Sequence, residues 1–237
     1  HNMTSILGTI GALSGRNFEE KTSVSLATRG QQFQSSDTFS EMMAGLESSI
    51  LRGSKIPMLL LRDVLQQGID TTQVLQQLET RPLTSEIYFA VAGASTGSII
   101  ARSRTALIQE LELGSTKNGK VYPSKMDTTW YIAATNFDWW VPMPVNPIIR
   151  KFTGHPDHRI QGVVTAMNKL GQKRCTTQAF TEVMQSSPIR VTPNWNFYTL
   201  YSSVLAPTKQ DIFSTFVYTL DGIPKPPAPE PRRSCPN

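Results

Sequence analysis

Three consecutive period-two runs, joined by very short connections, constrain the fold of this 237-residue chain most strongly. The runs are EIYFAVAG (residues 86–93), GSIIARSR (97–104) and ALIQELEL (106–113). Strands separated by only a few residues pair antiparallel, because a parallel pair needs a crossover of about a dozen residues or more. The sequence therefore predicts an antiparallel meander and argues against a doubly wound parallel sheet.

Helical periodicity flanks this meander on both sides in the sequence. Apolar residues recur at helical spacing after the cap candidates Ser36 and Asp37, and Gly53 ends that pattern. The order helices, strands, helices, strands is typical of an α+β fold. The remaining predicted elements are helices over 57–68, 70–82, 159–171 and 176–186, and strands over 21–30, 129–136, 196–207 and 211–222.

Composition narrows the class of protein. A content of 39% hydrophobic and 17% charged residues is typical of a globular domain, and no run of about 18 apolar residues predicts a membrane span. The net charge is +5, but the basic residues are scattered rather than gathered in a stripe, so nucleic acid is not an expected partner. We expect one domain over residues 1–222 and an extended proline-rich tail over 223–237.

Two short motifs resemble catalytic or phosphate-binding loops. GASTG (93–97) fits the nucleophile elbow with Ser95 as the attacking residue, but a strand rather than a helix is predicted after it. GSTKNGKV (114–121) approaches the phosphate-binding loop, but Val121 stands where that loop needs a hydroxyl. We interpret both segments as hairpin loops.

Histidine and cysteine residues are few. His155, Asp157 and His158 lie close together in GHPDHR, where a polar loop and helix cap explain them more simply than a metal site. Cys175 and Cys235 belong to no Cys-x-x-Cys pair, and whether they form a disulfide stays open. We expect neither a metal nor a cofactor.

The run WYIAATNFDWW (130–140) contains Asn136 and Asp138 among five aromatic residues, which a plain core strand would not. With other segments in the same order, it resembles the acid ceramidase and N-acylethanolamine acid amidase family, whose motif is W-[YF]-x-V-x-T-N-Y-D-x-W. Further matches are 157–161 to D-D-R-R-T, 198–203 to a strand motif, and 7–15 to A-G-Y-V-G-x-x-T-G.

The resemblance implies an N-terminal-nucleophile (Ntn) hydrolase fold, an αββα sandwich of antiparallel sheets flanked by helices. It also implies hydrolysis of linear amide C–N bonds of fatty acyl chains. In that family a cysteine freed at the N-terminus by self-cleavage is the nucleophile, and its α-amino group is the base. Asn136 matches the asparagine that holds the developing oxyanion, and Arg159 matches an arginine of the same site.

The sequence departs from the family where catalysis is concerned. Its matches begin after the family's first quarter, so the nucleophilic cysteine has no counterpart, and we expect a sandwich incomplete at its N-terminal side. The acidic residue of the family's N-E-R or D-E-R motif is replaced within Ala27-Thr28-Arg29. Ile160 replaces the second arginine of the family's R-R pair.

Two interpretations follow from these departures. In the first, the chain is a non-catalytic accessory or structural subunit of a larger assembly and turns over no fatty-acyl amide alone. In the second, it is most of a fatty-acyl amide hydrolase, acting on a ceramide or an N-acylethanolamine, whose cysteine segment is a separate or further chain. Under both, we expect other protein chains to cover the incomplete side, a relict pocket that could take a fatty-acyl amide lipid, and a tail lying along a neighbouring chain or this domain's own surface.

The compartment stays open at this point. The family implies a lysosomal or secretory route. The basic charge and the two cysteines leave an organellar assembly, such as a mitochondrial one, open as well.

Overall fold

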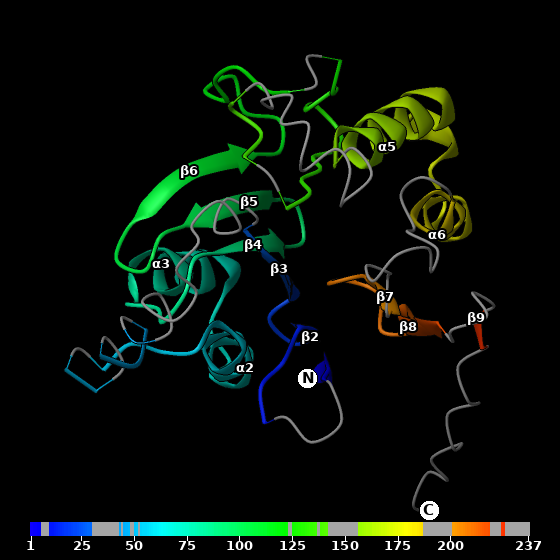
Figure 1. Cartoon of the computed structure of the whole chain (residues 1–237). Coiled ribbons are helices and arrows are strands. Elements are labelled where there is room, and N and C mark those ends of the chain that lie inside the picture. Colours follow the sequence, from blue (N-terminus) through cyan, green and yellow to red (C-terminus); the bar gives the residue numbers. More distant parts are fainter. Residues whose placement is uncertain are drawn as a thin grey trace, which may run out of the picture.

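A computed structural model gives the structure of the chain (Figure 1). It describes residues 1–5, 10–29, 43, 45–47, 50–51, 53–122, 125–136, 138–141, 156–186, 201–218 and 224–225. Within these residues the chain forms one six-stranded and one three-stranded antiparallel sheet, together with helices. The predicted α+β class with antiparallel sheets is therefore confirmed.

The six-stranded sheet follows the order of the sequence. Its strands are β1 (Asn2–Thr4), β2 (Ser14–Asn17), β3 (Thr22–Thr28), β4 (Ile87–Ala92), β5 (Gly97–Arg102) and β6 (Leu107–Glu112), and each pairs antiparallel with the next. The predicted meander of β4, β5 and β6 is confirmed. β3 pairs with β4, with Val24 opposite Val91, although the two strands are separated by a long insertion in the sequence.

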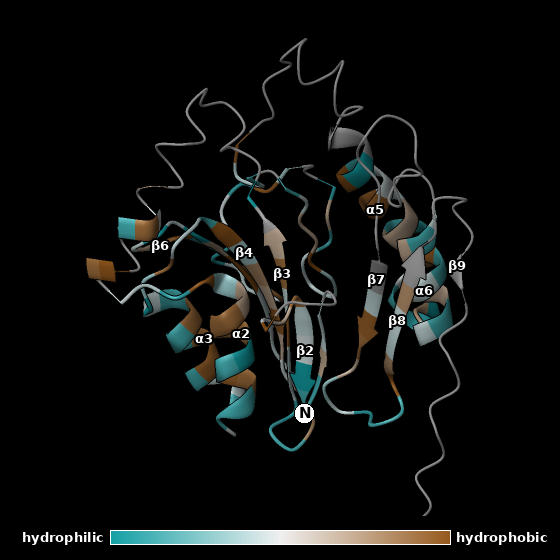
Figure 2. Cartoon of the chain, turned by 60° about the horizontal axis from the view of Figure 1, so that its bottom comes forward, coloured by the Kyte–Doolittle hydropathy of each residue, from teal (hydrophilic) through white to brown (hydrophobic). Residues whose placement is uncertain are grey.

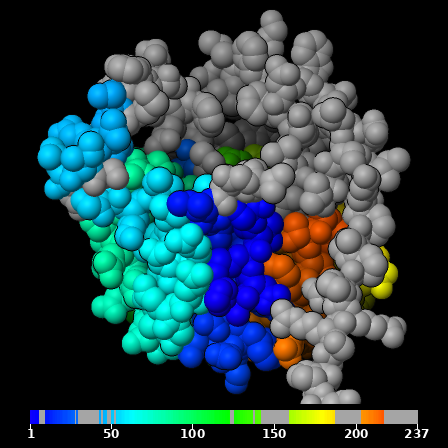
Figure 3. All heavy atoms as spheres, turned by 90° about the horizontal axis from the view of Figure 1, so that it is seen from below, coloured from blue at the N-terminus to red at the C-terminus, as the bar shows by residue number. Residues whose placement is uncertain are grey.

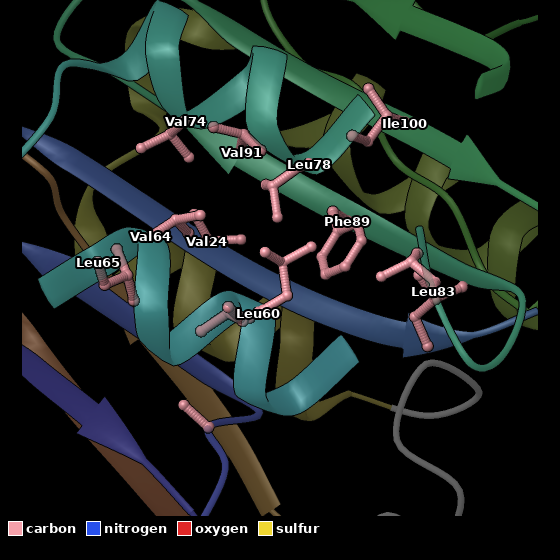
Figure 4. Close-up of a cluster of buried hydrophobic side chains, with 13 residues drawn as sticks. Val24, Leu60, Val64, Leu65, Val74, Leu78, Leu83, Phe89, Val91 and Ile100 are labelled. Atoms are coloured by element: carbon pink, nitrogen blue, oxygen red, sulfur yellow. The ribbon is translucent and has the colours of Figure 1, made fainter. Parts of the chain in front are cut away.

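Two helices from that insertion cover one face of the sheet. They are α2 (Pro57–Gln66), which has Pro57 in its first turn, and α3 (Thr71–Thr80), which begins with a capping box between Asp70 and Gln73. Their apolar faces pack on the inward residues of β3, β4 and β5 (Figure 4). The fully or nearly fully buried members of this first cluster include Leu61, Leu65, Leu78, Phe89 and Ile100.

The opposite face of the sheet is also buried. Tyr88, Ile99, Ala101 and Leu111 point to this side, because successive side chains of a strand alternate between faces. Side chains from 126–134 and from 139–140, together with the helix α5 (Pro156–Leu170), join them in one cluster, in which Trp139 and Val164 are almost fully buried. A 3-10 turn, η2 (Gln172–Arg174), leads from α5 to α6 (Thr177–Gln185), which contacts α5.

The three-stranded sheet consists of β7 (Tyr201–Leu205), β8 (Phe213–Tyr218) and β9 (Pro224–Lys225). Figure 2 shows α2 and α3 beside the first sheet, then β7 and β8, and then α5 and α6 on the far side. The threonine hydroxyls of Thr4 and Thr215 lie 2.8 Å apart and join the two sheets near the N-terminus. The short β9 shows that residues 224–225 of the predicted tail lie against β8; the rest of the tail is outside the described residues.

A buried arginine also connects the two sheets. Arg16 of β2 is 2% exposed, and its guanidinium donates hydrogen bonds of 2.5–3.1 Å to carbonyl oxygens of the β7–β8 connection. The acceptors belong to Ala206, Lys209, Gln210 and Ile212. Figure 3 shows the N-terminal strands in blue directly beside this hairpin in orange. The two sheets are thus joined by polar contacts.

The predicted strand over 129–136 is wrong. The segment begins in a turn, in which the backbone N–H groups of Trp130 and Tyr131 donate to the carbonyl of Asp127. The segment then runs past the second face of the sheet without pairing with a strand. Its side chains, including Tyr131 and Ala133, pack into the second cluster, so an apolar composition suited to a strand instead serves a packed loop.

Other expectations have mixed outcomes. Residues 93–96 form the predicted tight turn between β4 and β5, so GASTG is a hairpin and not a nucleophile elbow. Residues 114–121 follow β6 as a loop, but the expected hairpin is wrong because no described strand pairs on its far side. The predicted helix over 36–53 is helical at the residues described, 43, 45–47 and 50–51. None of the helices described is long and apolar enough to cross a membrane.

Candidate functional site

The two site residues implied by the resemblance meet in space. Asn136, in the loop after Tyr131, accepts a 2.8 Å hydrogen bond through Oδ1 from Nη2 of Arg159, in the first turns of α5. Arginine carries only donors, so it can bond the carbonyl oxygen of the amide and not its NH₂ group. The contact therefore fixes which way the amide of Asn136 is turned.

Arg159 remains a positive charge in this setting. The pKa of its guanidinium is lowered from the ordinary value, because burial disfavours the charged form. An arginine starts from so high a pKa that it stays protonated at any physiological pH. The pair thus offers one fixed positive charge and one oriented amide, which are groups suited to a carbonyl oxygen that gains negative charge.

A second polar cluster lies two positions further along the same loop. The carboxylate of Asp138 accepts hydrogen bonds from both Nε and Nη2 of Arg29, at 2.8 and 2.7 Å. Arg29 follows the end of β3, and its Nη1 also donates to Glu86 at 3.0 Å. A bidentate arginine–carboxylate pair of this kind fixes orientation as well as distance.

Tyr88 of β4 completes this cluster. Its hydroxyl donates a 2.5 Å hydrogen bond to Oδ1 of Asp138. The pKa of Tyr88 is raised strongly, first because the phenol is buried and then because it lies against the carboxylate, so the hydroxyl keeps its proton. The hydrogen bond to Asp138 likewise raises the pKa of Arg29. Arg29 therefore keeps its positive charge against Asp138.

Sequence reasoning missed this cluster. Arg29 and Asp138 were visible only as members of two matched motifs, the triplet 27–29 and the run 130–140. They stand 109 residues apart, and no local pattern relates residues at that distance. Their presence in the two motifs that carry the resemblance is the signal that could have joined them.

Other candidate nucleophiles lie elsewhere. Ser95 is exposed on the turn between β4 and β5, with no helix after it to stabilise an oxyanion. Cys175 is a free thiol, partly buried against the second cluster, and burial raises its pKa. A raised pKa reduces the thiolate fraction, which is the reactive form. Neither residue has the setting of an activated nucleophile.

A metal site was one interpretation of the sequence GHPDHR. His155 and the side chains of Asp157 and His158 lie outside what the structure describes. Among the described residues, no group of three or more His, Cys, Asp or Glu side chains is placed to hold a metal ion.

The architecture limits the class of fold to a mixed α+β one. Antiparallel sheets in a mixed α+β chain, with helices on either side, are compatible with an Ntn-hydrolase-type fold. Within this architecture Asn136 lies beside Arg159.

A comparison with known proteins finds weakly similar relatives. The chain is 25% identical over 158 residues to the N-acylethanolamine-hydrolyzing acid amidase of Oryctolagus cuniculus, covering 66% of this chain and 37% of that protein. The chain is 24% identical over 161 residues to the protein of the same description from Rattus norvegicus, which covers 67% of this chain and 37% of that protein. It is 23% identical over 164 residues to the one from Cavia porcellus, which covers 68% of this chain and 39% of that protein. No established protein-family profile matches the chain.

This weak homology supports a relationship to the acid-amidase family and suggests an amide hydrolase family. The chain spans 37–39% of the length of these curated relatives.

Proposed function

We propose that this chain forms the carbonyl-binding part of an amide hydrolase related to the acid amidases. The observation that supports the proposal is the 2.8 Å hydrogen bond between Arg159 and Asn136. These residues come from separate motifs of the resemblance and from separate structural elements. Folding nevertheless places them in contact, with the amide turned by a charged donor.

The chemistry needs such a pair. When a nucleophile attacks an amide carbonyl carbon, the oxygen gains a negative charge, and the C–N bond then breaks as the amine leaves with a proton. Donors that are already oriented stabilise this charge without having to reorganise. In the proposed enzyme Asn136 is the donor and Arg159 sets its orientation and the local positive potential.

The nucleophile of the proposed enzyme is the cysteine that the resemblance implies, supplied from outside these 237 residues. The substrate class follows from the relatives, which hydrolyse N-acylethanolamines by their description. We therefore assign a linear fatty-acyl amide, an N-acylethanolamine or a ceramide, as the substrate.

A second candidate function is a non-catalytic accessory subunit. The observation that favours it is Thr28, the last residue of β3, which stands where the resembled family has an acidic residue. That replacement lies inside the chain and next to Arg29. In this alternative the Asn136–Arg159 contact is a structural remnant in a larger protein assembly.

The experiment begins with the native protein, purified from its source, with its intact mass and N-terminal residue determined. Hydrolysis of an N-acylethanolamine and of a ceramide is then measured at acidic and neutral pH. We expect turnover by the native protein, none by residues 1–237 alone, and a loss of about 10²–10³ in kcat in Asn136→Ala. Ser95→Ala is the control and should retain activity.

The outcomes separate the two functions. Turnover that survives Asn136→Ala contradicts the assigned role of that residue. No turnover by the native protein on either amide, with co-purification in a stable complex, overturns the hydrolase and favours the accessory subunit. Activity of residues 1–237 only after addition of a cysteine-bearing segment supports a hydrolase formed from two chains.

A further inference from the structure

The loop that carries Asn136 is attached to the rest of the protein on two sides. On one side Arg159 of α5 binds the amide of Asn136. On the other side Arg29 and Tyr88, from β3 and β4, bind the carboxylate of Asp138. The two attachments lie two positions apart in the chain but belong to different layers of the fold.

The attachment at Asp138 is buried and geometrically specific. The side chains of Arg29 and Asp138 are 7% and 3% exposed. Two charges removed from water to this degree are stable only with close geometry and further hydrogen bonds. The bidentate contact, the Tyr88 hydroxyl and the Glu86 carboxylate supply them.

Aromatic contacts support the same attachment. The guanidinium carbon of Arg29 lies 5.7 Å from the ring centroid of Trp140, within cation–π distance. The ring of Tyr88 lies 5.7 Å from that of Trp139, and the two tryptophan rings meet edge to face at 4.8 Å. The loop after Asp138 is therefore held by the same two residues that hold its carboxylate.

The attachment constrains Asn136 through the backbone. Two residues of extended chain span at most about 7 Å, so the position of Asp138 limits where the amide of Asn136 can lie. Arg159 then selects its orientation within that range. A shift of about 1 Å in a group that binds a reacting atom can cost about a hundredfold in rate.

We propose that Arg29 is a positioning residue for the carbonyl-binding amide of Asn136, acting through Asp138, with Tyr88 as its partner. The catalytic meaning of this proposal rests on the proposed amide hydrolase. The positional coupling itself does not, because it can be measured without substrate. Loss of the bidentate contact releases the Asp138 end of the loop and displaces the amide from the orientation set by Arg159.

The decisive variant is Arg29→Lys. Lysine keeps the positive charge but presents a single ammonium group, which cannot form the two parallel hydrogen bonds of a guanidinium. The matched control is Arg81→Lys, an exposed arginine at the end of α3. Tyr88→Phe is the milder second variant, since it removes one hydrogen bond and leaves the ion pair in place.

The readout is the side-chain amide signal of Asn136 in a ¹⁵N-labelled sample of residues 1–237, assigned by its disappearance in Asn136→Asp. We expect this signal to shift in Arg29→Lys, to a smaller extent in Tyr88→Phe, and not in Arg81→Lys. Backbone signals of β5 and β6 should remain in place in all three. An unmoved Asn136 signal in folded Arg29→Lys overturns the proposal, and if that variant does not fold, an unmoved signal in Tyr88→Phe does so.

Kinetics on the native protein separate this proposal from the proposed function. With N-acylethanolamine as substrate, Arg29→Lys should lower kcat by about 10–100-fold with little change in KM. A native protein without any turnover refutes the hydrolase, while a shifted Asn136 signal still supports positioning by Arg29. Turnover that is normal in Arg29→Lys, despite a shifted signal, shows that the displacement has no catalytic effect and overturns the catalytic part of the proposal.

Discussion

The phenol of Tyr131 donates a 2.8 Å hydrogen bond to Oδ1 of Asn168, near the end of α5. The amide nitrogen of Asn168 in turn donates to the carbonyl of Lys125 at 2.9 Å. Asn136, further along the loop, contacts Arg159 near the start of the same helix. The loop from Lys125 to Asn136 therefore runs along α5 in the opposite direction, and the helix supports it at both ends.

Tyr131→Phe tests this support. The substitution keeps the buried ring but removes the donor to Asn168, so we expect a loss of about 0.5–1.5 kcal/mol in the free energy of unfolding. Urea unfolding followed by circular dichroism measures it. Tyr122→Phe, at a tyrosine beside the exposed Lys120, is the control and should change stability by about 0.5 kcal/mol or less. Equal losses in both variants contradict a specific role for the bond to Asn168.

Arg16→Met tests the connection between the sheets. Methionine fills much of the volume of Arg16 but leaves the carbonyl oxygens of the β7–β8 connection without the guanidinium donor. The carbonyls of Lys209 and Ile212 keep a backbone N–H donor, so the loss is that of the hydrogen bonds from the charged guanidinium, and we expect it to be about 1.5–3 kcal/mol. Hydrogen exchange of residues 203–216 should rise more than exchange of β4 and β5. Arg174→Met, at an exposed arginine that binds carbonyls of its own helix end, should cost about 1 kcal/mol or less.

Two glycines give a matched pair of packing tests. A Cβ atom on Gly11 would lie 2.5 Å from Cβ of Met58 in α2, closer than any real contact allows. Gly11→Ala should therefore force the segment before β2 away from α2 and destabilise the protein by about 1–3 kcal/mol. Gly119→Ala meets no atom within 4 Å and should be neutral or stabilising by up to about 1 kcal/mol. Thermal unfolding compares the two, and a milder effect at Gly11 than at Gly119 refutes the close packing.

The thiol of Cys175 gives a test of pH dependence. Burial raises its pKa, because the thiolate is disfavoured away from water. At any given pH the folded chain then holds less thiolate than the unfolded chain. The rate of alkylation by iodoacetamide should therefore rise at a higher pH in the folded chain than in the unfolded chain. The contribution of Cys175 to stability is complete below the pKa of the unfolded thiol and falls as pH rises above it.

The measurement uses a Cys235→Ser background so that only one thiol reacts. The rate of alkylation is followed against pH for the native chain and for the chain unfolded in urea. If the alkylation rate of the native chain rises at the same pH as that of the unfolded chain, or at a lower pH, burial of Cys175 is contradicted.

Local sequence signals predicted the regular elements well. The turn residues and alternation of 86–113 predicted β4, β5 and β6, and the predicted helices 57–68 and 70–82 correspond to α2 and α3. In these segments the periodicity and the boundary residues point to the same structure. Residues 129–136 carry a strand-like composition, but their conformation depends on Asp127 and on Asn168, and the second lies 37 residues away from Tyr131.

The candidate site was less accessible to such reasoning. Asn136 and Arg159 were found through motif resemblance, because no periodicity relates an irregular loop to the start of a later helix. The partners of Asp138 come from the end of β3 and the start of β4, and only the pairing of these strands brings Arg29 and Tyr88 together. Local patterns report neighbours along the chain, whereas polar clusters of this kind depend on the finished topology.

The hydrogen bonds of Arg16 to the β7–β8 connection also have a consequence for folding during synthesis. Its acceptors lie 190–196 residues further along the chain, so β2 leaves the ribosome long before they exist. At about 5–20 residues per second, this delay is roughly 10–40 s. Until then the guanidinium must stay hydrated, because burying it without acceptors is unfavourable. During synthesis β2 must therefore stay accessible to water or to a chaperone until the β7–β8 hairpin has been translated.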